Sequence, residues 1–68
     1  MIQVTINGTR AELQPGTHLS QLLEKLKMPP ERVAVEVNLS VIDKQKYSQF
    51  PIQEGDQIEI IGFVGGGN

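Results

Sequence analysis

The start of the chain alternates between apolar and polar side chains, with an apolar residue at every second position: Ile2, Val4 and Ile6. This two-residue period is typical of a strand with one buried face. Asn7-Gly8 follows, a pair preferred in type I′ hairpin turns. The alternation then resumes over residues 9–14 and ends at Pro15-Gly16. The pattern predicts a β-hairpin.

The next segment has a helical period, because leucines recur at spacings of three and four residues: Leu19, Leu22, Leu23 and Leu26. We expect this stripe to form the core, with Thr17 as the helix N-cap. His18 is expected to be exposed and without a partner. Met28-Pro29-Pro30 should end the helix, since a residue before proline is pushed out of the α region.

The two-residue period returns at 33–38 and predicts a third strand, joined by a turn to a short segment at Val41-Ile42. From residue 43 to 49 the pattern weakens. We expect an irregular crossing there, held by the rings of Tyr47 and Phe50, with at most a brief edge strand at Pro51-Ile52.

A turn at residues 54–56 leads into a last strand over 57–64. Its inward side chains are Ile58 and Ile60, whereas Ile61 and Phe63 fall on the opposite face. The three glycines and the asparagine that follow cannot build a core, so residues 65–68 are expected to form a flexible tail.

A hairpin, one helix and two or three further strands predict an α+β fold of the β-grasp (ubiquitin-like) type over residues 1–64. The single apolar stripe of the helix covers one face of a mixed sheet of four to five strands. Connection rules favour parallel first and last strands, with the last strand central. The tail would then begin at the end of a well-supported strand.

Composition excludes several classes of function. The 68 residues contain no cysteine and one histidine, so we expect no disulfide, no thiolate nucleophile and no metal site. Six basic and eight acidic residues give a net charge of −2, which argues against a nucleic-acid partner. We see no signal peptide and no membrane span, and expect a cytoplasmic protein.

Five short segments stand in a defined order along the chain: Asn7-Gly8, Leu22-Leu23, Ala-Val-Glu-Val-Asn at 34–38, Gly-Asp-Gln-Ile-Glu-Ile at 55–60, and Phe-Val-Gly-Gly-Gly at 63–67. Together they resemble the ThiS family of ubiquitin-like sulfur carriers of thiamin biosynthesis, over essentially the whole chain. Each segment alone is common, but their order and spacing in so short a chain are specific.

The resemblance implies a protein that is not an enzyme and binds no cofactor itself. Its C-terminal glycine would be adenylated by a ThiF-like enzyme of the ubiquitin-activating type, which consumes ATP. The acyl-adenylate would accept sulfur derived from a cysteine desulfurase and pass it, as a thiocarboxylate, to a ThiG-like thiazole synthase. By position, sulfur attaches at Gly67, and Gly65 and Gly66 thread into the partner sites.

The chain departs from the family pattern at Asn68, which follows the glycines. We therefore expect a precursor or inactive form from which Asn68 must be removed. The expected partner interface is Ile61, Phe63 and Val64, beside the tail. In the other interpretation, Tyr47 or Phe50 folds over Ile61 and Phe63 to form a minor core.

Two other functions stay open. The small subunit of molybdopterin synthase shares the fold and the glycine tail, but usually has a proline pair before the glycines, where this chain has Ile-Gly-Phe-Val at 61–64. A ubiquitin-like module that binds partners without activating its tail is the second. In each case we expect a monomer when the protein is alone.

Overall fold

The N-terminal hairpin forms as predicted in the computed structural model, which describes residues 1–62. Strands β1 (Ile2–Ile6) and β2 (Thr9–Leu13) pair antiparallel, with Ile6 opposite Thr9. Asn7 and Gly8 have φ angles of 50° and 82°, the left-handed conformation that a type I′ turn requires. The predicted end of the last strand, Phe63 and Val64, and the predicted tail at 65–68 lie outside the described residues.

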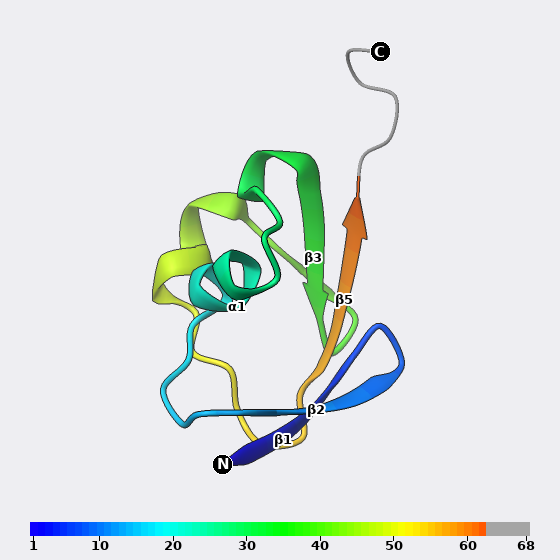
Figure 1. Ribbon diagram of the computed structural model, residues 1–68. Helices are drawn as coiled ribbons and strands as arrows, with labels where there is room; N and C mark the ends of the chain where they lie inside the picture. Colours follow the sequence, from blue (N-terminus) through cyan, green and yellow to red (C-terminus); the bar gives the residue numbers. More distant parts are fainter. Residues whose placement is uncertain (63–68) are drawn as a thin grey trace.

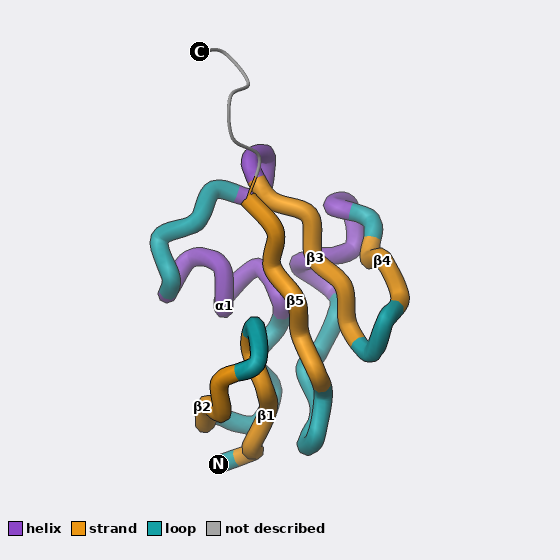
Figure 2. Tube along the Cα trace, turned by 90° about the vertical axis from the view of Figure 1, so that its right-hand side faces the viewer, coloured by secondary structure: helices purple, strands orange, loops and turns teal. Residues whose placement is uncertain are grey.

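The five strands form one mixed sheet in the order β2-β1-β5-β3-β4. Strands β3 (Val33–Val37) and β4 (Ser40–Ile42) form a second hairpin, and β5 (Gln57–Gly62) lies between β1 and β3 (Figure 2). The β1–β5 pairing is parallel and the β3–β5 pairing is antiparallel. This is the predicted β-grasp arrangement with a central last strand.

The helix α1 (Leu19–Lys25) covers one face of the sheet (Figure 1). Its N-cap is His18, so the assignment of Thr17 was wrong: the Thr17 hydroxyl donates to the Gln14 carbonyl instead, at 2.7 Å. The expectation of an isolated, exposed His18 was also wrong. Its backbone N–H donates to Gln21 Oε1 at 2.8 Å, its ring Nδ1 lies 3.2 Å from the same atom, and the side chain is half-buried.

The helix ends in a Schellman motif before the prolines are reached. Lys27 adopts φ 60°, its N–H donates to the Glu24 carbonyl, and the Met28 N–H donates to the Leu23 carbonyl. The short 3₁₀ helix η1 (Pro30–Arg32) then leads into β3. Met28-Pro29-Pro30 therefore follows a helix that Lys27 has already ended.

The core lies between α1 and the sheet. It is built from buried apolar side chains of α1, of every strand except β4, and of the segment that follows β4. These are Val4, Leu13, Leu19, Leu22, Leu23, Val33, Val35, Val37, Tyr47, Ile52, Ile58 and Ile60. Three of the four predicted leucines are in this set. Leu26 was wrongly assigned to it, because it follows the last helical residue and is 39% exposed.

The segment predicted as irregular is a six-residue 3₁₀ helix, η2 (Lys44–Gln49). Its Tyr47 ring enters the core, and Phe50 packs at the core edge. Pro51 makes only an isolated bridge with His18. None of the helices in residues 1–62 has the length and apolar character needed to cross a membrane.

Candidate functional site

The C-terminal end of β5 is the part of the described structure nearest in sequence to the predicted acceptor. Gly62 lies opposite Val33 at the end of the β3–β5 pairing. Among the predicted site residues, Ile61 is described, whereas Phe63, Val64, Gly65, Gly66 and Gly67 lie outside the described residues. The geometry of the site is therefore that of the strand that leads to the glycines.

The side chain of Asn7 holds the end of β5. Backbone pairing between β1 and β5 stops at Ile6 and Ile58, and the Asn7 N–H donates to the Ile58 carbonyl at 2.8 Å. Beyond this point the Asn7 side chain takes over: its Oδ1 accepts from the Ile60 N–H at 2.7 Å and its Nδ2 donates to the Ile60 carbonyl at 3.2 Å. One amide group thus replaces the next residue of a neighbouring strand.

A second asparagine holds the start of β5. Asn38 Oδ1 accepts from the Gln57 N–H at 3.0 Å, and the Asn38 N–H donates to the Gln57 carbonyl at 2.8 Å. Asn38 Nδ2 also donates to Asp56 Oδ1 at 2.9 Å, while Asp56 Oδ2 accepts from the Gln53 N–H at 2.8 Å. Asp56 is buried, and these bonds satisfy its carboxylate.

Both asparagines occupy left-handed positions of hairpin turns, with φ 50° at Asn7 and 53° at Asn38. From the sequence, both asparagines were predicted only to form turns, and their contacts with β5 were not predicted. The residue type could have indicated these contacts. Asparagine tolerates positive φ, and its side chain carries a donor and an acceptor that can mimic a peptide group. The β5 strand is thus fixed at both ends by the turns of the two hairpins.

The face of the sheet away from α1 is open and carries Ile61. Ile61 is 49% exposed and lies opposite Ala34 of β3. Tyr47 is buried in the core on the helix side. The interpretation that Tyr47 or Phe50 covers Ile61 in a minor core is therefore wrong for Ile61, and for Phe63 it lies outside the described residues.

Two glutamates of this outer face lie directly opposite each other. Glu36 of β3 is in register with Glu59 of β5, and Glu36 faces Val41 of β4 on its other side. Glu36 is half-buried, whereas Glu59 and Val41 are exposed. The outer face therefore combines apolar and acidic groups along the strand that leads to the glycines.

The titratable side chains of residues 1–62 offer no metal-binding cluster, and one of them, Tyr47, is buried in the core. No three histidine, aspartate or glutamate side chains in this part of the chain are grouped closely enough to hold a metal ion. Burial raises the pKa of the Tyr47 phenol, a hydrogen bond with the Val35 backbone opposes this, and the negative charge of Asp43 adds to it. Burial therefore favours the neutral phenol in the folded state.

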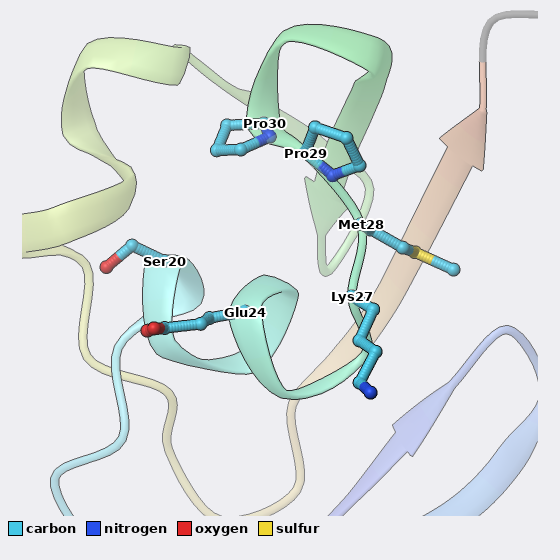
Figure 3. Close-up of a pocket in the computed structure, with 6 residues that line it drawn as sticks. All are labelled: Ser20, Glu24, Lys27, Met28, Pro29 and Pro30. Atoms are coloured by element: carbon cyan, nitrogen blue, oxygen red, sulfur yellow. The ribbon is translucent and has the colours of Figure 1, made fainter.

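A hollow of about 460 Å³ lies on the helix side, lined by Ser20, Glu24, Lys27, Met28, Pro29 and Pro30. Figure 3 shows Ser20 and Glu24 on one side of α1, with Lys27 and Met28 pointing away from them. Because these polar groups do not converge on one point, the hollow provides no acid–base pair. None of its lining residues belongs to β5.

Comparison with known proteins gives a family match over residues 4–67, to the model of the ThiS family. The chain is 41% identical over 66 residues to a thiazole synthase of Magnetococcus marinus, covering 97% of this chain and 20% of that protein. It is 33% identical over 67 residues to the sulfur carrier protein ThiS of Bacillus subtilis, covering 98% of this chain and 100% of that one.

The fold comparison agrees. The crystal structure of the thiamine biosynthesis protein ThiS from Geobacter metallireducens superposes with a TM-score of 0.83 at 29% identity, covering 97% of this chain and 100% of that one. The chain spans only 20% and 21% of the length of the two thiazole synthases it matches. The matches therefore include both free-standing proteins of this size and a segment of longer ones.

Proposed function

Because this chain belongs to the ThiS family, we propose that it is a sulfur carrier protein whose C-terminal glycine becomes a thiocarboxylate and donates sulfur for thiazole formation in thiamin biosynthesis. The observation that carries this proposal is the extent of the family match, which runs from the first strand through Gly67. The match thus includes the three glycines together with the fold that precedes them.

The chemistry of a carboxylate explains why partners are needed. A carboxylate is a poor electrophile, so one of its oxygens must first become a good leaving group. The glycine carboxylate attacks the α-phosphorus of ATP on the adenylating enzyme and pyrophosphate leaves. The terminal sulfur of a persulfide formed by a cysteine desulfurase then attacks the carbonyl carbon and AMP leaves. A thiol reductant cleaves the resulting S–S bond and leaves the thiocarboxylate. The carrier is a substrate in each of these steps and is not itself the enzyme.

We assign the reacting carbon to Gly67. Gly65 and Gly66 precede it without side chains, so a narrow channel of a partner enzyme can admit them. The assignment requires a free carboxylate on Gly67, and hence removal of Asn68. With no cysteine in the sequence, the carrier must hold sulfur on a carbonyl carbon.

Two enzymes are the proposed partners in the cytoplasm. A ThiF-like adenylating enzyme would activate Gly67, and a ThiG-like thiazole synthase would receive the sulfur. The thiazole synthase of Magnetococcus marinus supports the second partner, because a segment similar to this chain is part of that polypeptide. The names of the matched proteins favour thiazole formation over the molybdopterin alternative.

We further propose that Ile61, together with Phe63 and Val64, contacts the partner enzymes. Ile61 supports this because it is half exposed on the open face of the sheet, one residue before the end of β5. Substitution of both Ile61 and Phe63 by serine is expected to weaken binding to the adenylating enzyme and to the synthase. Unchanged binding of this variant to both enzymes would refute the interface.

The experiment that tests the function is intact mass spectrometry after reaction. A chain ending at Gly67 is incubated with the adenylating enzyme, ATP, cysteine, a cysteine desulfurase and a thiol reductant, and should gain the mass of one oxygen-to-sulfur exchange. The same reaction with Asn68 retained, and with residues 66–68 deleted, gives the controls. Failure of the chain ending at Gly67 would reject the transfer chemistry, and equal conversion of the chain ending at Asn68 would reject the assignment to Gly67.

Adding thiazole synthase and its other substrates to the converted chain tests the pathway. Loss of the thiocarboxylate with formation of the thiazole is the expected result. Sulfur transfer to the large subunit of molybdopterin synthase instead would favour the molybdopterin alternative. Partner binding that does not change when residues 66–68 are deleted, without any sulfur uptake by the intact tail, would favour the non-covalent module.

A further inference from the structure

The direct pairing of Glu36 with Glu59 is unfavourable for folding. The two residues are in register on neighbouring antiparallel strands and on the same, outer face of the sheet. Side chains in such positions have Cβ atoms about 4.5–5.5 Å apart, and like charges directly opposite each other destabilise a sheet. Glu36 is also half-buried, which reduces the screening of its charge by water.

The sheet itself offers this pair no neutralising cation. The other cross-strand neighbour of Glu36 is Val41, and the next pair toward the end of β5 is Ala34 with Ile61. The nearest basic residue by sheet register is Arg10 on β2, opposite Thr5, two strands away from β5. The remaining basic residues of the chain lie in or beside the helical segments: Lys25, Lys27, Arg32, Lys44 and Lys46.

The surroundings of the pair point to a protein partner. By register, Ile61, Ala34 and Val41 are the neighbours of the two glutamates on the outer face, and Ile61 and Val41 are exposed large apolar residues. Apolar contacts around a charged centre exclude water when a partner docks, which strengthens the electrostatic interaction at the centre. An acidic pair within an apolar border complements a basic side chain that projects from an apolar surface.

We propose that Glu36 and Glu59 together bind an arginine side chain of the thiazole synthase, with Ile61, Ala34 and Val41 packing around it. The guanidinium group is planar and carries five donors, so it can bond two carboxylates at once and remove their repulsion. The inference rests on the proposed function. The synthase is the expected partner because two relatives contain a segment similar to this chain within a thiazole synthase polypeptide. A separate chain must instead recognise that enzyme through its surface.

This arrangement makes stability and binding change in opposite directions. Replacing one glutamate by glutamine removes the repulsion in the free carrier and also removes a charge that the arginine needs. A residue with a purely structural role would lower both properties together. The opposite signs therefore identify a pair retained for binding.

The test uses Glu36→Gln, Glu59→Gln and the double substitution in the full chain. Glu12→Gln is the matched control. Glu12 is exposed on the outer face of β2, so this substitution removes the same charge at a position away from Glu36 and Glu59. Binding to the thiazole synthase from the same organism is measured by titration calorimetry at low and high salt. Urea denaturation gives the stability of each free variant.

Each single substitution is expected to weaken binding to the synthase about tenfold, and the control less than about twofold. The wild-type affinity should fall with salt more steeply than that of the double variant. Urea midpoints of the two single variants should equal or exceed the wild-type midpoint. Binding losses equal to that of the control, or losses accompanied by lower stability, would each overturn the proposal.

The proposed function is tested separately in the same samples. Thiocarboxylate formation by the variants at saturating adenylating enzyme is followed by intact mass. If the wild-type chain gains no sulfur, the proposed function fails, while the binding measurements still decide whether the acidic pair recognises the synthase. If all variants gain sulfur normally and bind the synthase equally well, the function stands and the assignment of the acidic pair is wrong.

Discussion

The two faces of β5 differ in burial at alternate residues, with core residues on one face and exposed residues on the other. Toward α1, Ile58 is 1% exposed and packs in the core, and Ile60 is buried beside it. On the outer face, Glu59 is exposed and Ile61 is half exposed, and no helix covers them in the described structure. Because successive side chains of a strand point to opposite faces, the two faces can be changed independently.

The stability of this domain resides in the core, to which the inner face of β5 belongs. A domain of this size has only about 3–5 kcal/mol of net stability, supplied by one core. The inner face of β5 contributes to that core, and the asparagine side chains of two turns hold the strand in place. The outer face is open, and we propose that it binds partners. The following substitutions examine this division, in order of decreasing effect.

The largest effect is expected on the inner face. Ile58→Ala should lower the free energy of unfolding by about 3–4 kcal/mol, because it removes buried methyl groups and leaves a cavity. This is most of the stability of the domain, so the variant should be largely unfolded at room temperature by circular dichroism. Ile61→Ala, its counterpart on the outer face, should change stability by less than about 0.5 kcal/mol. Equal losses at both positions would break the comparison.

Removing the side chain that holds the end of β5 should have the next largest effect. Asn7→Gly keeps the left-handed turn unstrained but deletes both bonds to Ile60, and should cost about 1–2 kcal/mol in urea denaturation. Amide hydrogen exchange should be faster at Ile60 in this variant.

Asn38→Gly is the matched control for that experiment, because its side chain bonds the other end of the strand. Faster exchange is expected there at Gln57. The interpretation fails if Asn7→Gly leaves the Ile60 amide as protected as in the wild type, or if both variants loosen the two ends of β5 equally.

A stabilising substitution is expected in the β3–β4 turn. Leu39 is 89% exposed and has φ 73°, a conformation that costs a residue with a branched side chain about 1 kcal/mol or more. Leu39→Gly converts the turn to Asn-Gly, as at Asn7-Gly8, and should raise the urea midpoint. A lower midpoint would show that the exposed leucine contributes packing, and lost synthase binding would extend the docking surface to this turn.

The smallest effect concerns the pH dependence of stability through Tyr47. Burial raises its pKa in the folded state above the ordinary value of 10.0, so the neutral phenol is favoured in the fold. As pH rises above about 10, the unfolded chain loses this proton first and stability falls. Denaturation between pH 8 and 11 should show this fall in the wild type, and a shallower one in Tyr47→Phe. Parallel curves would contradict the assignment.

Much of the fold follows from the sequence, because local signals were unambiguous. The two-residue period at 2–6 and 33–37, the Asn7-Gly8 turn and the leucine spacing define the elements. Connection rules then place β5 beside β1, as found. The helix cap was predicted wrongly because Thr17 and His18 are adjacent and either could cap the helix. The helix at 44–49 was not predicted because a short 3₁₀ helix has no strong periodic pattern.

The sequence by itself determined the class of the protein: a β-grasp carrier that leads to a glycine run, recognised from the order of its segments. The sequence also determined which chemical groups the protein has: it contains no cysteine and one histidine. Only the tertiary structure decided which side chains contact each other across neighbouring strands. The bonds from Asn7 and Asn38 to β5 and the pairing of Glu36 with Glu59 join residues far apart in sequence. Such contacts depend on strand register, which the packing of a whole apolar face sets and which no local pattern contains.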